Sequence, residues 1–366
     1  MRVRLGLLIS LLWAQSGRYW DSLFNWRLET ATYGEAVSVL GSLQTLRANF
    51  YIPEADTVTN RPVIVILFGG AYISGSRNDA DVTHIARYFA KRGYVAATID
   101  YRIGLTQPTA TEWIKASVRA MHDLKAFIRY LKHSFTEEGN PYGIDTNRIY
   151  VGGSSAGAFT ALHAAYLTSE AELAQVPQAD ISYLSTQGGI EGNSGNPGYS
   201  SRFAGVFSLS GGMLKTSWIQ PDKVSAVIAM HGTGDVTVPY RSGSLPIILL
   251  PAEGGYNIDS VAAARGLYHA LFTWRGAGHV PYGTQQSVNP TYMKDVEEFL
   301  RYHFYQWNTR FATSLQSELQ DKSPEMMYSV WSLDGRYVGE FSIGDLPSGV
   351  WVLRQRTGTF RRVYRP

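Results

Sequence analysis

The chain carries the stretch Val151-Gly-Gly-Ser-Ser-Ala-Gly157, which contains a Gly-x-Ser-x-Gly motif centred on Ser155. The apolar residues 148–151 predict a short buried strand, and residues 158–165 predict the beginning of a helix. A serine between the two lies on a sharp strand-to-helix turn, where small neighbours tolerate strained backbone angles and the hydroxyl projects outward. The amide of Ala156 then falls at a helix N-terminus, where it can stabilise an oxyanion. A Gly/Ser-rich turn is often no more than a turn, but the strand before it and the helix after it favour a nucleophilic serine.

Apolar runs and helical patterns alternate along the chain on both sides of this motif. Residues 63–68 form a continuous apolar run, as expected for a strand buried on both faces, and residues 95–100 predict a second such strand. Residues 111–133 place apolar side chains at helical spacing. Similar patterns predict an entry hairpin within residues 28–53, helices at 81–92 and 293–304, and strands at 203–209 and 227–230. This alternation predicts an α/β fold with a mostly parallel central sheet flanked by helices.

Composition and charge indicate an ordinary globular protein. The chain has 366 residues, of which 45% are hydrophobic and 17% are charged. Its net charge of +3 comes from arginines near the two ends, because without those seven the 33 basic residues fall to 26 against 30 acidic ones. A nucleic-acid partner is therefore not expected. The chain has no cysteine, which excludes disulfides, zinc–thiolate sites and a cysteine nucleophile.

The N-terminus has the pattern of a secretory signal peptide. Residues 1–16 combine a basic beginning, an apolar stretch over residues 5–14 and small residues after it. The apolar stretch is too short to span a bilayer, and a buried first helix is the alternative. No later stretch offers about 18 uninterrupted apolar residues, so we expect the mature protein to be soluble or surface-attached.

Two segments depart from the alternating pattern of the main domain, which we place at residues 17–307. Residues 173–201 are a Gly- and Asn-rich insertion directly after the helix that follows Ser155, and an insertion of this length predicts a lid or a binding loop. Residues 308–322 predict a polar linker. Residues 323–366 predict a small all-β module that contains a hairpin at 327–341 around an Asp-Gly turn.

The residues that would activate Ser155 can be sought by chain order. A serine hydroxyl needs an imidazole to take its proton, and the imidazole needs a carboxylate to fix its tautomer. When the serine lies on a strand-to-helix turn of this kind, the order along the chain is Ser, Asp or Glu, then His. Asp235 and His279 each follow a predicted strand, so both are expected on loops beyond strand ends. Each interval leaves room for about one further strand–helix unit.

Other ionisable residues compete for these roles. Asp100 follows a predicted strand and Glu191 lies in the insertion, so either is a rival acid, and Asp235 could merely shape its own turn. We expect His231 to be structural, at the base of the loop that carries Asp235. We expect His163, in the helix after Ser155, to pack or to face solvent. The chain order favours Asp235 over its rivals.

Acyl transfer also needs amides directed at the developing oxyanion. Residues 68–75, Phe-Gly-Gly-Ala-Tyr-Ile-Ser-Gly, form the glycine-rich turn expected after the strand at 63–68. The amides of Gly70, Ala71 and Ala156 are the candidates. The alternative is that the glycines only allow the chain to turn.

Aromatic residues in the predicted loops are candidates for lining a substrate pocket. They are Tyr72, Tyr199, Trp218 and Tyr240. Because the chain is 13% aromatic, some would fall near the site by chance. This chemistry requires no metal and no cofactor.

Taken together, residues 33–305 resemble the α/β-hydrolase superfamily, on its carboxylesterase and lipase side. The resemblance rests on four stretches: Phe68-Gly-Gly-Ala-Tyr72 for the oxyanion motif, Gly153-Ser-Ser-Ala-Gly157 for the nucleophile elbow, His231-Gly-Thr-Gly-Asp-Val-Thr-Val-Pro239 for the acid loop, and Asp100-Tyr-Arg102. It implies ester hydrolysis through a Ser-Asp-His triad and an acyl-enzyme. Phe68 departs from the family pattern. A histidine usually occupies this position and supports the loop, so in this chain another contact must support the loop.

The C-terminal segment resembles the sorting domain of the Bacteroidota type IX secretion system. The resemblance rests on Ser332-Leu-Asp-Gly-Arg-Tyr-Val338 and Leu346-Pro-Ser-Gly-Val-Trp-Val352, followed by a basic end. It implies a partner in the type IX machinery and export across the outer membrane, with release or surface attachment. A carbohydrate-binding module is the alternative for this segment.

The leading hypothesis is therefore a secreted serine carboxylic-ester hydrolase. Its substrate would be an extracellular ester: an acetylated or feruloylated polysaccharide, a lipid or a polyester. The alternatives are a serine peptidase on the same fold and an adhesion protein on an inactive scaffold. The oligomeric state does not follow from the sequence.

Overall fold

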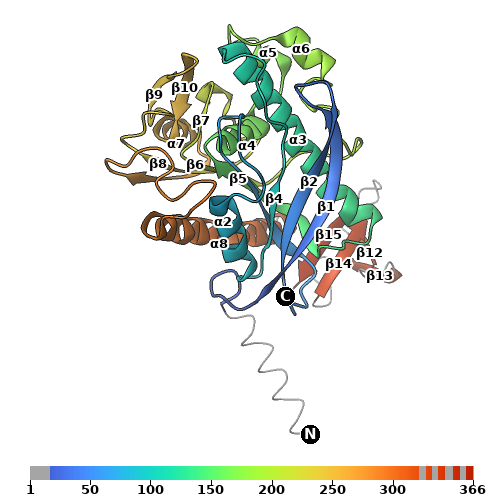
Figure 1. The fold of residues 1–366 in the computed structure, drawn as a ribbon. Helices are drawn as coiled ribbons and strands as arrows, with labels where there is room; N and C mark the ends of the chain where they lie inside the picture. The colour runs from blue at the N-terminus through green and yellow to red at the C-terminus, as the bar shows by residue number, and fades with distance from the viewer. Residues whose placement is uncertain (1–16, 321–326, 332–336, 343–348, 355–359, 366) are drawn as a thin grey trace. The chain divides into compact units, whose positions relative to one another are not determined.

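The computed structural model describes residues 17–320, 327–331, 337–342, 349–354 and 360–365 (Figure 1). The predicted signal peptide at residues 1–16 lies outside the described residues. The chain divides into two compact units, Met1–Tyr305 and Gln306–Pro366, and each is described by itself.

The first unit is built on an eight-stranded sheet with the order β1-β2-β4-β3-β5-β6-β8-β11. The strands are β1 (Trp26–Val37), β2 (Leu43–Pro53), β3 (Arg61–Leu67), β4 (Val95–Ile99), β5 (Ile144–Ser154), β6 (Gly205–Leu209), β8 (Ala226–Gly232) and β11 (Tyr268–Trp274). From β4 to β11 all neighbours are parallel, whereas β1 pairs antiparallel with β2, and β2 with β4. The predicted entry hairpin and the mostly parallel sheet are confirmed.

The central strands are buried because helices cover both faces of the sheet. Every residue of β3, β4, β6 and β8 is buried, which explains their unbroken apolar sequences. The helices are α2 (Ala80–Ala90), α3 (Ala110–Glu137), α4 (Ala156–Tyr166), α7 (Gly255–Ala264) and α8 (Pro290–Gln320). Phe89 of α2 contacts Phe304 of α8, and Phe127 of α3 contacts Phe50 of β2. Figure 1 shows α3 and α4 on one face of the sheet, with α2 and α8 on the other.

Short elements fill the connections above the sheet. They are α5 (Glu170–Leu173), α6 (Ile181–Thr186), η1 (Thr216–Trp218), and a second sheet of β7 (Gly212–Met213), β10 (Leu250–Gly254) and β9 (Ser242–Leu245). No helix in the described part of the chain combines the length and the apolar character needed to span a membrane.

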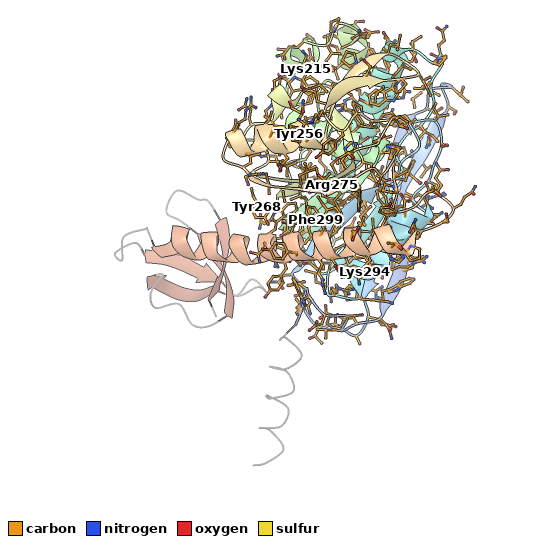
Figure 2. All side chains as sticks on the ribbon, turned by 90° about the vertical axis from the view of Figure 1, so that its left-hand side faces the viewer. Lys215, Tyr256, Tyr268, Arg275, Lys294 and Phe299 are labelled. Atoms are coloured by element: carbon orange, nitrogen blue, oxygen red, sulfur yellow. The ribbon has the colours of Figure 1, made fainter. Side chains whose placement is uncertain are left out.

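The last helix is longer than the sequence pattern predicted. We expected a helix at residues 293–304 and a polar linker at 308–322, but α8 runs from Pro290 to Gln320. The stretch from 291 to 322 contains neither glycine nor proline, so nothing in its sequence interrupts a helix. Within the first unit, Phe299 of α8, which is labelled in Figure 2, packs against Phe272 of β11 with ring centroids 5.9 Å apart.

The second unit contains a four-stranded antiparallel sheet with the order β13-β12-β14-β15. Its strands are β12 (Met327–Trp331), β13 (Tyr337–Ser342), β14 (Gly349–Arg354) and β15 (Phe360–Arg365). The predicted hairpin is present, with Met327 opposite Ser342. Its Asp-Gly turn lies outside the described residues.

Candidate active site

Ser155 lies on a sharp turn between the end of β5 and the beginning of α4. Its backbone angles are φ 50° and ψ −115°, a conformation that a non-glycine residue rarely adopts and that strains the backbone by about 1–3 kcal/mol. The turn also brings the chain against β3. A Cβ on Gly153 would lie 2.3 Å from the carbonyl oxygen of Leu67, and one on Gly157 would lie 2.4 Å from the same atom. Both positions therefore require glycine, which explains the Gly-x-Ser-x-Gly pattern.

Ser155, His279 and Asp235 form a continuous chain of hydrogen bonds. The Oγ of Ser155 lies 2.8 Å from Nε2 of His279, and Nδ1 of His279 lies 2.7 Å from Oδ2 of Asp235. Because the carboxylate can only accept, Nδ1 donates to it, and Nε2 is left to accept the serine proton. The strands β5, β8 and β11 are parallel, so the residues that follow them meet at one edge of the sheet.

Asp235 is held as a carboxylate. Burial by itself would raise its pKa, but hydrogen bonds from His231 and His279 outweigh this effect and hold the pKa well below the ordinary value. The amides of Thr237 and Val238 each donate to Oδ1 at 2.9 Å. The carboxylate therefore remains charged at neutral pH, where it fixes the tautomer of His279 and can stabilise an imidazolium.

Residues 68–75 form a loop that passes close to Ser155. A Cβ built on Gly69 would lie 3.3 Å from Cβ of Ser155. The carbonyl of Gly70 accepts hydrogen bonds from the amides of Ile73 and Ser74, and this closes the turn. Within the described part of the chain, the amides of Gly70, Ala71 and Ala156 donate to no other residue. These three amides therefore have no acceptor within the described residues.

Positive φ angles shape this loop. Gly70 has φ 114°, Ala71 55° and Tyr72 62°. Two non-glycine residues in succession with positive φ are strained, and a fixed environment is needed to hold them. Tyr72 supplies part of it, because its buried hydroxyl donates to the carbonyl oxygen of Ala156 at 3.0 Å. That bond ties the oxyanion loop to the first turn of α4.

Comparison with known proteins identifies the fold. The BD-FAE family model matches residues 48–190, which include the oxyanion loop and Ser155. Esterase 2 of Thermogutta terrifontis phosphorylated by paraoxon superposes with a TM-score of 0.52 at 21% identity over 75% of this chain and 93% of that one. Its propionate-bound form gives 0.51 at 22% identity over 74% and 93%. This chain has the α/β-hydrolase fold.

Curated relatives are esterases that match only parts of this α/β-hydrolase chain. The probable isoprenylcysteine alpha-carbonyl methylesterase ICME of Oryza sativa subsp. japonica is 26% identical over 225 residues, or 56% of this chain and 50% of that protein. Carboxylesterase 3 of Pongo abelii is 33% identical over 112 residues, or 30% and 18%. The chain spans half or less of the length of the curated relatives it matches.

The α/β-hydrolase fold does not bring the four predicted pocket residues together at Ser155. Tyr72 belongs to the oxyanion loop, and its side chain is buried with the hydroxyl on the carbonyl oxygen of Ala156. Trp218 is 2% exposed and packs against the ring of His163. Tyr240 bonds to the hydroxyl of Thr273 on β11.

Tyr199 lies at the wrong end of the domain for a pocket residue. Its hydroxyl donates to Glu137 at the C-terminal end of α3. The chain turns there into the beginning of β5, whereas Ser155 follows the end of that strand. Proximity in sequence to the helix after Ser155 misled the prediction.

The rival acids are engaged elsewhere. Asp100 pairs with Arg77, and Glu191 pairs with Lys125 and Arg129. The neighbouring Ser154 is also occupied, since its Oγ lies 2.7 Å from the hydroxyl of Tyr282. In the part of the chain that the structure describes, no group of three or more His, Asp or Glu side chains is placed to hold a metal ion.

The insertion at residues 173–201 follows helix α3 along its length instead of forming a structureless loop. Tyr183 accepts a hydrogen bond from Arg119, and Glu191 pairs with Lys125 and Arg129. The part around α6 lies near the N-terminal end of α3, at the edge of the sheet that carries Ser155, whereas Gly192 and Ser194 meet the middle of α3 at His122 and Asp123. We therefore call residues 173–201 the α3 strap. Two buried cations of α3, Lys125 and Arg129, hold the middle of the strap in place.

Proposed function

We propose that this protein is a serine carboxylic-ester hydrolase in which Ser155 is acylated. One observation carries the proposal: the chain of hydrogen bonds from Ser155 Oγ through His279 to Asp235, with distances of 2.8 and 2.7 Å. Carboxylesterases and methylesterases among the curated relatives support ester hydrolysis as the reaction.

The geometry supports a two-step reaction. Ser155 Oγ attacks the ester carbonyl carbon while its proton passes to Nε2 of His279, and the amides of Gly70, Ala71 and Ala156 receive the oxyanion. His279 then returns the proton to the leaving alcohol as the C–O bond breaks. Water attacks the acyl-enzyme with His279 again as base, which releases the acid and restores the serine.

We further propose that the substrate is an ester outside the cell. The support is the signal-peptide pattern of residues 1–16 and the likeness of the C-terminal segment to type IX sorting domains. Acetylated or feruloylated polysaccharides, lipids and polyesters all contain the required carbonyl. A p-nitrophenyl ester series from acetate upward, run beside feruloyl and polymeric esters, selects among them.

Export can be tested separately from chemistry. In a host with a type IX system, removal of residues 321–366 should trap the protein in the periplasm. Normal surface delivery of the truncated protein would contradict the sorting role. Loss of activity on insoluble substrate alone would instead indicate a carbohydrate-binding module.

Acylation of Ser155 is tested with a fluorophosphonate probe. Wild type should be labelled and Ser155→Ala should not, while Ser154→Ala serves as the matched control because Ser154 bonds to Tyr282. Labelling at Ser154 would contradict the assignment. Cleavage of peptide anilides without ester turnover would favour the peptidase alternative.

A further inference from the structure

Two imidazoles, not one, contact the carboxylate of Asp235. Its Oδ2 lies 2.7 Å from Nδ1 of His279 and 3.1 Å from Nε2 of His231. His231 is the penultimate residue of β8 and is fully buried. Its Nε2 contacts Oδ2 of Asp235 and the carbonyl oxygen of Val238, so His231 is not a link in the chain of hydrogen bonds that ends at Ser155.

The hydrogen bonds of His231 fix its tautomer. The amide of Gly255, at the beginning of α7, donates to Nδ1 of His231 at 3.2 Å. Because an amide N–H can only donate, Nδ1 carries no proton, and the hydrogen of the neutral ring is on Nε2. That hydrogen is shared between Oδ2 of Asp235 and the carbonyl oxygen of Val238, each 3.1 Å away.

The ring of His231 is also fixed in space. A Cβ on Gly255 would lie 3.1 Å from Cβ of His231, so the backbone of α7 packs directly against it. On another side, the ring of Tyr240 meets it edge-on with centroids 5.8 Å apart. Tyr240 in turn packs against Tyr256 of α7, which is labelled in Figure 2, with ring centroids also 5.8 Å apart. A donor held so firmly can orient the carboxylate it contacts.

We propose that His231 is a positioning residue of the triad, which holds Oδ2 of Asp235 in line with His279 and takes up part of its negative charge. This inference rests on the proposed function. A carboxylate held by a second donor keeps His279 in line with Ser155, although it shares its charge with that donor and so stabilises the imidazolium of His279 less. Without His231 the carboxylate should turn more freely, so His279 is aligned less well with Ser155 and kcat falls. The larger charge left on Oδ2 should favour the protonated form of His279 in the variant, which moves the acid limb to higher pH.

Other titratable groups lie beside His231 and Asp235, and substitutions of His231 leave them unchanged. Tyr240 directly follows the acid loop, and Tyr282, three residues after His279, interacts electrostatically with Asp235 and with Asp81 of α2. Substitution of His231 changes none of these residues.

Two substitutions separate positioning from packing. In His231→Gln the side-chain amide can still donate toward Oδ2 of Asp235, but the acceptor for Gly255 is lost. In His231→Asn the carbonyl can still accept from Gly255, but the donor to Asp235 is lost. Both remove the ring, so a purely structural role affects them alike.

We expect kcat for p-nitrophenyl acetate to fall about tenfold or more in His231→Asn, with KM changed less, and to stay several-fold higher in His231→Gln. The acid limb of kcat/KM should move to higher pH in His231→Asn and less in His231→Gln. Equal losses that follow the melting temperatures, with the acid limb unmoved in both, would overturn the proposal.

A measurement on wild type avoids any failure of the variants to fold. With 15N-labelled histidine, the resonances of His231 should show a protonated Nε2 and a bare Nδ1 across the active pH range. The opposite tautomer would overturn the proposal even if the enzyme is active. Absence of ester turnover and of fluorophosphonate labelling in wild type would instead refute the proposed function.

Discussion

The rings of Phe68 and Tyr101 stack with centroids 4.0 Å apart and planes 10° from parallel, and the Tyr101 hydroxyl donates to the carbonyl oxygen of Phe68 at 2.7 Å. Gly75 closes the loop over the Phe68 ring, where a Cβ would lie 2.4 Å from Cδ2. This aromatic pair supports the beginning of the oxyanion loop at the position where the α/β-hydrolase pattern has a histidine.

Removing only the Tyr101 hydroxyl should therefore loosen the oxyanion loop. We expect Tyr101→Phe to lower kcat about three- to tenfold with little change in KM, because a displaced amide stabilises the oxyanion less well than a fixed one. Tyr166→Phe is the matched control, since its equally buried hydroxyl donates to the carbonyl of Val224 away from this loop. Both variants should lose about 1 kcal/mol of stability. An equal fall of kcat in the control would argue against loop support.

Substitutions in the triad should be far more severe. His279→Ala should lower kcat by several orders of magnitude, and Asp235→Asn by on the order of 10³–10⁴, because an amide can leave the imidazole in the wrong tautomer. Asp100→Asn is the control, as Asp100 pairs with Arg77. Full activity of Asp235→Asn in a steady-state assay would transfer the role to another acid.

The low pKa of Asp235 determines which group shapes the pH profile. A carboxylate whose folded pKa is depressed stays charged above its ordinary pKa and is neutralised only as the pH falls through the folded value. Asp235 should thus add no inflection to kcat/KM between about pH 4 and 9. In His279→Ala, the residual kcat/KM should no longer show a separate fall on the acid side of the pH profile.

Asp81 should make the fold less stable at alkaline than at acid pH. Burial raises its pKa to about 6, above the unfolded value of about 3.9, so the folded state binds the proton more tightly and stability falls as the pH rises through this window. We expect Asp81→Asn to melt above wild type at pH 8, by at most about 3 kcal/mol in unfolding free energy, with the gain gone near pH 4. Asp222→Asn, on the exposed surface, should show no such pH-dependent difference.

The α3 strap should depend on Glu191. Lys125 and Arg129 are 4% and 5% exposed, so Glu191→Gln leaves two buried cations without their carboxylate. Because Glu191 itself is half exposed, we expect a loss of about 1–2 kcal/mol, below that of a fully buried pair, and faster proteolysis within residues 173–201. Turnover of p-nitrophenyl acetate should stay within about threefold. A collapse of acetate turnover in the folded variant would show that the strap supports the triad.

Residues beyond Gln320 should be dispensable for chemistry. All three triad residues lie in the first unit, and the second unit forms its own sheet. A chain that ends at Gln320 should keep kcat/KM for a soluble ester within about twofold, with a melting shift of only a few degrees. A larger loss of activity in the folded product would show that the second unit contributes to the site.

The parts of the fold that could be predicted are those encoded locally. The buried strands have unbroken apolar sequences, and the elbow needs small residues at fixed positions, so Ser155, Asp235 and His279 could be chosen from chain order. Contacts between segments that are far apart in the chain leave no comparable pattern in the sequence. In the sequence, Lys125 and Arg129 look like ordinary basic residues of an amphipathic helix. Their role in holding the strap follows only from the structure, which places Glu191 beside them.

This dependence on contacts between distant segments also explains which predictions were wrong or missing. The second contact of His231 depends on an amide in a helix 24 positions later, which no local motif signals. Aromatic content could not locate the pocket, because Trp218 and Tyr199 satisfy packing and surface contacts elsewhere. The length of α8, by contrast, could have been inferred from the uninterrupted run without glycine or proline.

The way the α3 strap is attached makes part of it open to redesign. Lys125 and Arg129 hold it through Glu191 and through the main-chain carbonyls of residues 190, 191 and 195. On α6, the side chains of Ser182, Ser185 and Thr186 are exposed, and none of them takes part in this attachment. A combinatorial library at these three positions would vary the surface at the edge of the sheet that carries Ser155 while leaving the anchors untouched, and directed evolution of substrate preference can begin there.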